Sequence, residues 1–437
     1  MNTILKFIIV FIYAALFVYV AIGQFIPNEI LIYGICIVVA VGFIILTGKH
    51  IMKQPFSRLL LVATFFFLIS VPLAGEKEEK SFEKRALAEF PKFRWGNVWK
   101  FFFGYQSYFN DRFAFRNDAV QAISKFRFRV FRISPMPQLV RVGSNDWLYT
   151  SRDEYILDTS NPFTEQQLDT VVMHLEMITK YFDIRNIKYY YSMTPIKERI
   201  YPEHMPADLR HKMKVSKAEQ LYERLKNNKK IRWVNYKKEL IEGKKIRPTY
   251  YNLDTHWNEF GAYVAYKKII ERIAEDFPSI LPYAENDIAI DSTITDAGDL
   301  QLLMGFRDEL LFERYELKFK NPVYPTIIDS SDYDEKPSRY SIREMPGQKS
   351  GLKLFLVRDS FSEYLRIFLT PHFDRTVLAW MPVIPIAKAV DEKPDIVIQQ
   401  MLEQFVMFTL LLPPEIKGDT LFLNQHFPGY LKITKKN

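Results

Sequence analysis

The sequence predicts an α/β fold built on a mostly parallel, doubly wound sheet, and three observations predict it. Between residues 164 and 399, short apolar runs of strand length alternate with segments whose apolar residues recur at helical spacing. The most strand-like run, 353–357, leads directly into a serine and a second helical pattern. Thr194 and Ser360 both follow strands, and sites in such sheets form at the carboxyl ends of strands. We therefore expect an active site at that edge.

The first 75 residues predict a membrane region with three transmembrane helices. The apolar stretches 5–25, 30–46 and 58–73 each approach the ~20 residues that cross a bilayer. A signal peptide is the alternative for the first stretch, but its long apolar core and the second stretch close behind favour a span. Lys49, Lys53 and Arg58 lie between the second and third stretches, and the positive-inside rule places them in the cytoplasm. We expect a multi-pass protein of the cytoplasmic membrane whose domain, 76–437, faces the periplasm or cell exterior.

The segments after the membrane region can be assigned in order. The aromatic-rich segment 90–116 is expected to lie in a core or at the interface with lipid. The short runs 140–142 and 147–149 flank Gly-Ser-Asn-Asp, which predicts a hairpin.

The sheet domain then begins with a helix after Thr164, for which Gln167 completes a capping box. The later elements are strand 188–193, helix 216–227, strand 231–235, helix 259–277, strand 353–357, a helix ending near 371, strand 375–380, a short helix 387–390 and strand 395–399. Residues 279–351 are less regular, and we expect an insertion or a separate small sheet there.

Composition excludes several classes of function. The net charge is +8 and the sequence pI is near 9.1, but no nucleic-acid-binding signature accompanies the charge, so an anionic lipid surface or acidic glycan suits it better than nucleic acid. The single cysteine, Cys36, rules out intrachain disulfides and thiolate clusters. No His-Glu-x-x-His motif or Gly-rich phosphate loop is present, and we expect neither a metal nor a cofactor.

The stretch 254–258, Asp-Thr-His-Trp-Asn, predicts the base half of a hydrolytic site. In an extended segment, residues two apart share a face, so Asp254 can bond one nitrogen of His256 and leave the other free. Ser360 would then be the nucleophile of an acyl-transfer reaction, with His256 as its base. Each residue also has a structural interpretation. Ser360 and Glu363 match a capping box, and a lone buried histidine is more often a hydrogen-bonded core residue.

In this order, the motifs resemble the SGNH-hydrolase-like acetyltransferases of the alginate O-acetylation type from bacterial exopolysaccharide systems. The matching segments are Asp254-Thr255-His256-Trp257, Asp359-Ser360-Phe361, Arg85-Ala86-Leu87-Ala88, Phe90-Pro91, Tyr108-Phe109-Asn110-Asp111-Arg112-Phe113, Trp147-Leu148-Tyr149, Pro195-Ile196-Lys197, Tyr201-Pro202-Glu203 and Gly298-Asp299-Leu300. The resemblance implies an SGNH-like fold in permuted order, with Asp-x-His before the serine. It also implies that Asp254, His256 and Ser360 are catalytic and that Lys197 and Tyr201 lie near the site. Arg358 stands where the family often has glycine, beside the expected oxyanion loop.

We therefore expect a polysaccharide or cell-surface glycan O-acetyltransferase that acts through an acetyl-serine outside the cytoplasmic membrane. The resemblance implies that a membrane-bound O-acyltransferase supplies the acetyl group. One alternative is a glycan deacetylase or esterase with the same three residues. Another is a non-catalytic polysaccharide-binding assembly component. A transporter has little support, because the predicted spans lack intramembrane charges.

Overall fold

The computed structural model describes residues 58, 86–113, 116–151, 162–295, 298–305, 310–320, 325–330, 340–347, 350–428 and 430. The chain forms two compact units, 1–131 and 132–437. The three predicted spans lie outside the described residues, apart from Arg58. Of the helices in the described ranges, none has both the length and the apolar character needed to cross a bilayer.

The described part of the first unit contains a short 3-10 helix, η1 (Trp95–Asn97), and two α-helices, α4 (Val98–Arg112) and α5 (Arg116–Phe131). Asn97 caps α4 by accepting a hydrogen bond from the backbone N–H of Lys100 at 3.2 Å. The segment before η1 folds back along α4, where Asp111 accepts from the backbone N–H of Ala88 at 2.9 Å.

A seven-stranded sheet forms the centre of the second unit, in the order β4-β3-β11-β9-β10-β8-β7. The first five strands in this order are parallel, and β8 and β7 complete one edge in antiparallel pairing. The strands are β3 (Lys188–Thr194), β4 (Arg232–Val234), β7 (Thr326–Ser330), β8 (Tyr340–Glu344), β9 (Lys353–Arg358), β10 (Arg375–Trp380) and β11 (Ile396–Leu402). The predicted α/β fold with a mostly parallel sheet is confirmed.

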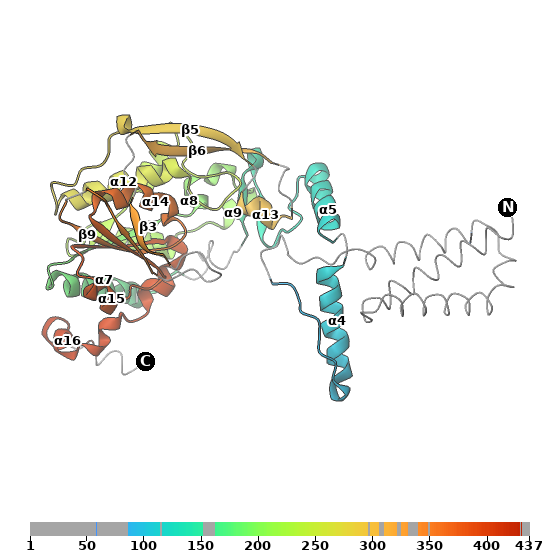
Figure 1. Cartoon of the computed structure of the whole chain (residues 1–437), viewed down its shortest axis with the longest axis horizontal. Coiled ribbons are helices and arrows are strands. Elements are labelled where there is room, and N and C mark those ends of the chain that lie inside the picture. Colours follow the sequence, from blue (N-terminus) through green and yellow to red (C-terminus); the bar gives the residue numbers. More distant parts are fainter. Residues whose placement is uncertain are drawn as a thin grey trace. The chain divides into compact units, whose positions relative to one another are not determined.

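Helices cover both faces of this sheet (Figure 1). On one face lie α12 (Glu259–Ala274) and α14 (Ser362–Leu369), and on the other lie α7 (Glu165–Asp183), α10 (Lys217–Leu225) and α15 (Ile386–Asp391). Because strand side chains alternate between faces, Leu354 and Leu356 of β9 join the first core while Phe355 and Val357 join the second. The remaining α-helices of the described ranges are α8 (Lys197–Ile200), α9 (Ala207–Lys212), α11 (Lys237–Gly243), α13 (Asp299–Leu303) and α16 (Thr420–His426), and the short 3-10 helix η3 (Pro202–His204) follows α8.

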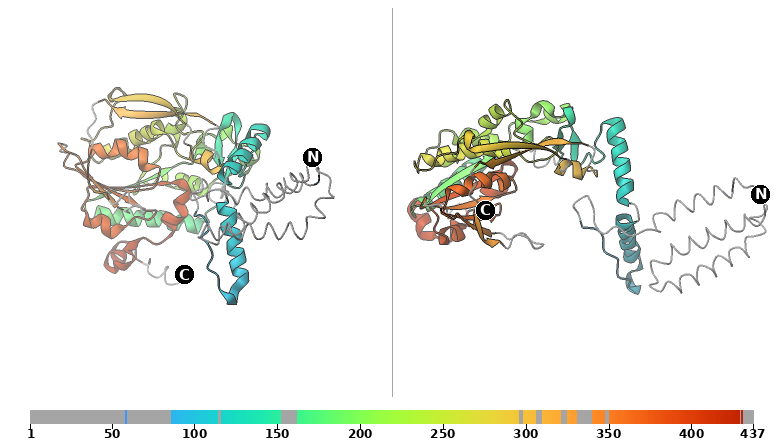
Figure 2. Two further views of the ribbon diagram at one scale, coloured as in Figure 1. Left: turned by 45° about the vertical axis from the view of Figure 1, so that its right-hand side comes forward. Right: turned by 45° about the horizontal axis from the view of Figure 1, so that its top comes forward.

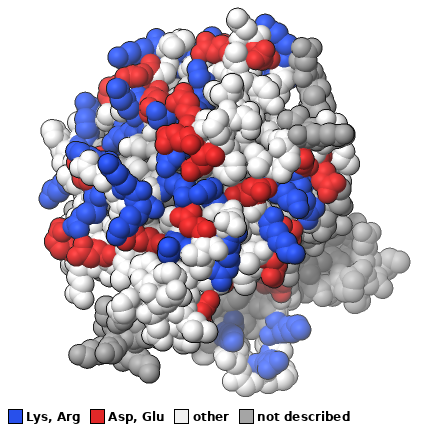
Figure 3. Space-filling model, turned by 90° about the vertical axis from the view of Figure 1, so that its left-hand side faces the viewer, with Lys and Arg blue, Asp and Glu red and all other residues white. Residues whose placement is uncertain are grey.

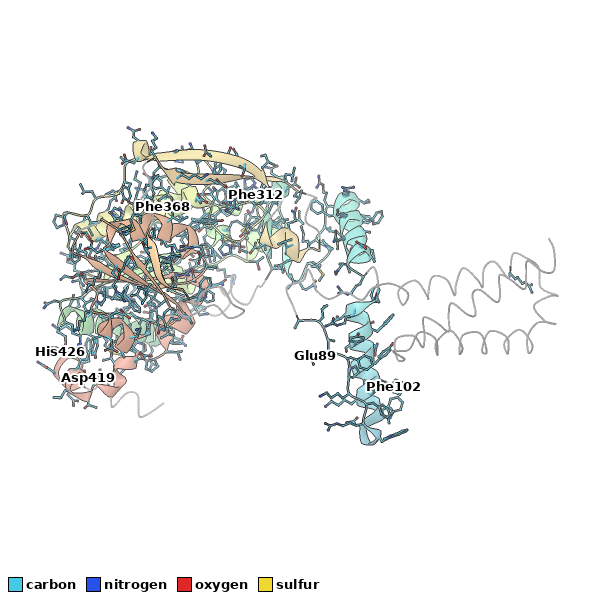
Figure 4. The ribbon with its side chains drawn as sticks, in the orientation of Figure 1. Glu89, Phe102, Phe312, Phe368, Asp419 and His426 are labelled. Atoms are coloured by element: carbon cyan, nitrogen blue, oxygen red, sulfur yellow. The ribbon has the colours of Figure 1, made fainter. Side chains whose placement is uncertain are left out.

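Two small antiparallel sheets flank the main one. The predicted hairpin is present as β1 (Val140–Val142) and β2 (Leu148–Thr150). The second pair, β5 (Ile288–Thr295) and β6 (Phe312–Phe319), forms a long ribbon near α12 in both views of Figure 2. The ring centroid of Phe319 on β6 lies 5.9 Å from that of Phe368 on α14, and Figure 4 labels Phe368. Within the predicted irregular region 279–351, β5 and β6 therefore form a sheet of their own, while β7 and β8 extend the main sheet.

Capping residues in the sequence mark where several helices begin. Thr164 and Gln167 form the predicted capping box of α7, and Ser216 and Glu219 form another at α10. Asn258 caps α12 by accepting from the backbone N–H of Gly261 at 2.9 Å. On the face of the domain shown in Figure 3, basic and acidic side chains are interspersed, without a continuous basic patch.

Candidate active site

A six-residue loop, 251–256, presents the predicted base, and we call it the base loop. Tyr250 and Trp257 pair as an isolated antiparallel bridge at its two ends, and Asn258 donates its backbone N–H to Thr249 O at 3.0 Å. Inside the loop the backbone bends instead of running as a strand. The prediction that residues 254–256 are extended is therefore wrong, because the bridge between Tyr250 and Trp257 closes the chain into a loop.

Asp254 and His256 nevertheless meet. Asp254 Oδ1 accepts hydrogen bonds from the backbone N–H of His256 at 2.9 Å and from its Nδ1 at 2.7 Å. This bond assigns the proton to Nδ1 and leaves Nε2 as an acceptor. Burial alone would raise the pKa of Asp254, but the hydrogen bonds and the charge interaction with His256 are stronger and lower this pKa to about 2. Burial alone would also lower the pKa of His256, but the hydrogen bond and the charge of Asp254 have the larger effect, so the pKa of His256 is raised.

Ser360 lies on the other side of the imidazole. Its Oγ is 2.8 Å from Nε2 of His256, within hydrogen-bond distance. The predicted capping box at Ser360 is wrong: α14 begins at Ser362, its N-cap is Phe361, and no side chain caps it. Glu363 instead pairs with Arg358 and Arg366. The Ser360 hydroxyl is therefore directed to His256 and does not cap α14.

Asp359 fixes the turn that carries Ser360. Its Oδ1 accepts from the backbone N–H of Phe361 at 2.9 Å, and its Oδ2 accepts from the backbone N–H of Leu402 at 2.6 Å. These two bonds join the end of β9 to the end of β11. Burial raises the pKa of Asp359 to about 6, against the opposing effect of the two N–H groups.

Trp257 and Phe361 join the base loop to the turn at Ser360. The indole Nε1–H of Trp257 donates to Phe361 O at 2.8 Å. The Phe361 ring lies 4.8 Å from the imidazole of His256, measured between centroids. Both side chains are buried, so the two halves of the site share one packed contact.

Lys197 and Tyr201 support the base loop instead of facing Ser360. Lys197 is buried, and its Nζ donates to the carbonyl oxygens of Tyr251, Asn252 and Asp254 at 3.2, 3.3 and 2.6 Å. Burial lowers the pKa of Lys197 to about 8, although nearby carboxylates oppose this. The Tyr201 hydroxyl accepts from the backbone N–H of Thr249 at 2.8 Å, just before the loop.

Arg358 is buried at the end of β9, and its guanidinium is directed away from the serine. It forms an ion pair with Glu363, and its Cζ lies 4.6 Å from the ring centroid of Trp380 on β10. Among the described residues, Arg358 has no hydrogen bond to Ser360. The structure thus brings together Asp254, His256 and Ser360 but does not bring Arg358 into that set.

Asp299 is a site residue that sequence reasoning assigned no role, although Gly298-Asp299-Leu300 is among the matching motifs. Its two carboxylate oxygens accept from the N–H and the hydroxyl of Thr255 at 2.9 and 2.8 Å. Its own N–H donates to Asp254 Oδ2 at 3.0 Å, and its Oδ2 is 4.0 Å from Nδ1 of His256. Burial and the charge of Asp254 raise the pKa of Asp299.

Gly298 allows this approach, because a Cβ there would lie only 2.3 Å from Leu253 O. The signal that could have found Asp299 is therefore this glycine, which marks a close backbone contact. Within the described ranges, Asp254, His256 and Asp299 are the one set of His, Cys, Asp or Glu residues spaced to hold a metal ion. Their ligand atoms are already hydrogen-bonded to one another or to Thr255, which favours support of the base over metal binding.

Residues 140–379 match the family described as "SGNH hydrolase-like domain, acetyltransferase AlgX". No curated protein matches the sequence.

The solved structures that are similar to the chain include the following three. Bacillus cereus PatB1 is 12% identical, over 63% of this chain and 99% of its own, with a TM-score of 0.49. The O-acetyltransferase domain of Pseudomonas putida AlgJ is 15% identical, over 66% and 98%, with a TM-score of 0.42. Pseudomonas aeruginosa AlgX is 14% identical, over 60% and 61%, with a TM-score of 0.40. Because the family match spans more than half of the 437 residues, the chain belongs to the AlgX-type acetyltransferase family of SGNH hydrolase-like domains.

Proposed function

We propose that the protein is an O-acetyltransferase that moves an acetyl group, through an acetyl-Ser360 intermediate, onto a hydroxyl of a polysaccharide or cell-surface glycan. The supporting observation is the pair of hydrogen bonds that runs from Asp254 Oδ1 to Nδ1 of His256, 2.7 Å, and from Nε2 to Ser360 Oγ, 2.8 Å. This order of carboxylate, imidazole and hydroxyl suits nucleophilic acyl transfer. Membership of an acetyltransferase family supports the same chemistry.

In the first half-reaction, Ser360 Oγ attacks the carbonyl carbon of the acetyl donor while its proton passes to Nε2 of His256. The bond to the leaving oxygen then breaks, and Nε2 returns the proton to that oxygen. Asp254 stabilises the imidazolium that forms in between. In the described part of the chain, the backbone N–H of Ser360 has no hydrogen-bond acceptor, so it is free to donate to the developing oxyanion.

In the second half-reaction, a sugar hydroxyl gives its proton to Nε2 and attacks the acetyl carbon. Ser360 leaves and recovers the proton from His256. Water can attack in the same position, and transfer therefore requires the acceptor to displace water from the acetyl-serine. A deacetylase or esterase would use the same residues with water as the acceptor.

We also propose that residues 1–75 anchor the domain, with 76–437 outside the cytoplasmic membrane. The three apolar stretches and the cationic residues between the second and third support this. Because acetyl-CoA is cytoplasmic, a membrane-bound O-acyltransferase would then have to pass the acetyl group across. Protease added to intact spheroplasts should digest the domain, and its complete protection would overturn this orientation.

The catalytic proposal is tested with the full-length protein in detergent and p-nitrophenyl acetate as donor. Acid quenching and peptide mass spectrometry should find one acetyl group on Ser360, and Ser360→Ala should lose both the label and turnover. An unchanged rate in Ser360→Ala would overturn the proposal. Adding an oligosaccharide then separates the two outcomes: acetylated sugar supports transfer, whereas free acetate alone identifies an esterase.

A further inference from the structure

Helix α4 has an aromatic surface that lies uncovered in the described part of the first unit. None of its fifteen residues is buried. On one face, Phe101, Tyr105 and Tyr108 pack against the ring of Phe90, at centroid distances of 6.2, 6.1 and 5.2 Å. The segment that folds back before η1 therefore covers this face.

The opposite face of α4 is exposed among the described residues. Trp99, Phe102 and Phe103 follow the spacing i, i+3, i+4, which places them along one side of the helix. Their exposed fractions are 76, 55 and 66%, and Trp95, which lies just before α4 in η1, is 87% exposed. Figure 4 shows the ring of Phe102 projecting away from α4. The stripe of one indole and two phenyl rings on α4, with the exposed indole of Trp95 just before it, exposes more apolar surface than isolated exposed residues normally do.

Helix α5 repeats the pattern with aliphatic and aromatic residues. Ile123, Phe126 and Val130 lie at i, i+3, i+7 and are 61, 58 and 56% exposed. Lys125, Arg127 and Arg129 are interspersed with them. Each helix thus combines a bare apolar stripe with cationic side chains.

The charge of this region identifies the chemistry of its partner. Between residues 86 and 131 there are eight Lys and Arg and three Asp and Glu, a net charge of +5 out of +8 for the chain. Lys92, Arg94 and Lys100 are exposed near the aromatic stripe of α4. Trp and Phe stripes bordered by cations are typical of helices that lie in the interface of a bilayer with anionic headgroups.

We infer that α4 lies in the plane of an anionic lipid surface, with Trp95, Trp99, Phe102 and Phe103 in the interfacial region and the neighbouring cations among the headgroups. The exposed aromatic rings and the net positive charge of residues 86–131 support this inference. The preceding apolar stretch, 58–73, would keep α4 near the bilayer, a point that rests on the membrane region proposed above. The catalytic assignment has no part in it.

The test uses the full-length protein in nanodiscs of phosphatidylcholine and phosphatidylglycerol with bromine at the 6,7 positions of one acyl chain. Bromine should quench a blue-shifted part of the tryptophan emission, and this part should disappear in Trp95→Phe/Trp99→Phe. Trp233→Phe, which removes a tryptophan from β4 in the sheet domain, should leave the quenched part unchanged. Replacing phosphatidylglycerol with phosphatidylcholine should weaken the quenching.

Two results would overturn the inference. Emission of Trp95 and Trp99 at the wavelength of water-exposed indole would mean that the stripe faces solvent. Blue-shifted emission without bromine quenching would mean that protein covers it. The outcome is independent of the acetyl-Ser360 experiment, because α4 contributes no residue to the candidate site.

Discussion

The imidazole of His256 lies beside two carboxylates with opposite tendencies. The pKa of Asp254 is lowered to about 2, so it stays ionised, whereas burial and the charge of Asp254 raise the pKa of Asp299. Both carboxylates raise the pKa of His256. Because only neutral His256 can accept the proton of Ser360, activity should fall as pH decreases through this raised pKa, above the usual value near 6.5.

Asp299→Asn should move the fall of activity at acidic pH to lower pH, because it removes a negative charge 4.0 Å from Nδ1 of His256 while keeping a side chain that can bond Thr255. The pH profile of kcat/KM with an aryl acetate measures the shift. Asp291→Asn, on the exposed face of β5, is the matched control and should leave the fall of activity at the same pH. If the pH at which kcat/KM falls is the same in Asp299→Asn as in the unmodified protein, Asp299 has only a structural role.

Lys197→Met should reduce kcat by about 10²-fold with little change in KM. The buried ammonium is the shared donor to three carbonyl oxygens of the base loop, and small displacements of a catalytic base have effects of this size. Steady-state kinetics with an aryl acetate measures the effect. Lys244→Met is the control, because Lys244 also donates to a backbone carbonyl, that of Ile200, but not to the base loop. Equal losses in the two variants would contradict a positioning role for Lys197.

At the scale of elements, the turn between β9 and α14 depends on Asp359, which accepts one N–H within the turn and one from β11. Asp374 has a comparable position at the other end of the sheet, where its carboxylate accepts from the N–H groups of Ser350 and Gly351. The two aspartates therefore support similar turns, of which one carries the nucleophile.

Asp359→Asn should cost about 1–3 kcal/mol of the free energy of unfolding, because the amide must direct its NH₂ toward one of the two N–H groups. It should also lower kcat, whereas Asp374→Asn should lower stability alone. Urea unfolding and kinetics measure these effects. A fully active Asp359→Asn would contradict the role given to this turn.

The pH dependence of stability gives a second measurement on the same variant. The pKa of Asp359, about 6 when folded, exceeds the ordinary value near 3.9, so the folded chain retains a proton that the unfolded chain releases. The contribution of Asp359 to stability is therefore fully present below about pH 4 and is lost as the pH rises through about 6. Asp359→Asn should lack this slope.

Local sequence patterns predicted much of the fold because strands and caps are encoded locally. Thr164 caps α7 as predicted, and Ser216 and Asn258 cap α10 and α12 through the same kind of local hydrogen bond. Ser360 and Glu363 have the sequence pattern of a capping box, but they do not form one. The carboxylate of Glu363 pairs with Arg358 and Arg366, and the hydroxyl of Ser360 lies against His256. The approach of Asp299 to the base loop depends on contacts between residues more than 40 apart, which no local pattern specifies.

At the scale of the whole molecule, the second unit has its own sheet and a core on each face. The order of the strands in that sheet could not be predicted from the sequence, because the antiparallel edge β8-β7 and the position of β11 arise from long-range packing. Residues 132–437 expressed alone should therefore unfold in one cooperative transition and turn over an aryl acetate. Circular dichroism during heating measures the first expectation. A fragment without a cooperative transition would show that the first unit is required for folding.

The place of β11 has a consequence for biosynthesis. It is the last strand of the described chain, yet it lies between β3 and β9, so the parallel part of the sheet is complete only after β11 inserts. Leu402, at its end, also supplies an N–H to Asp359. A nascent chain that already contains Asp254, His256 and Ser360 should thus remain inert until its final strand has been translated.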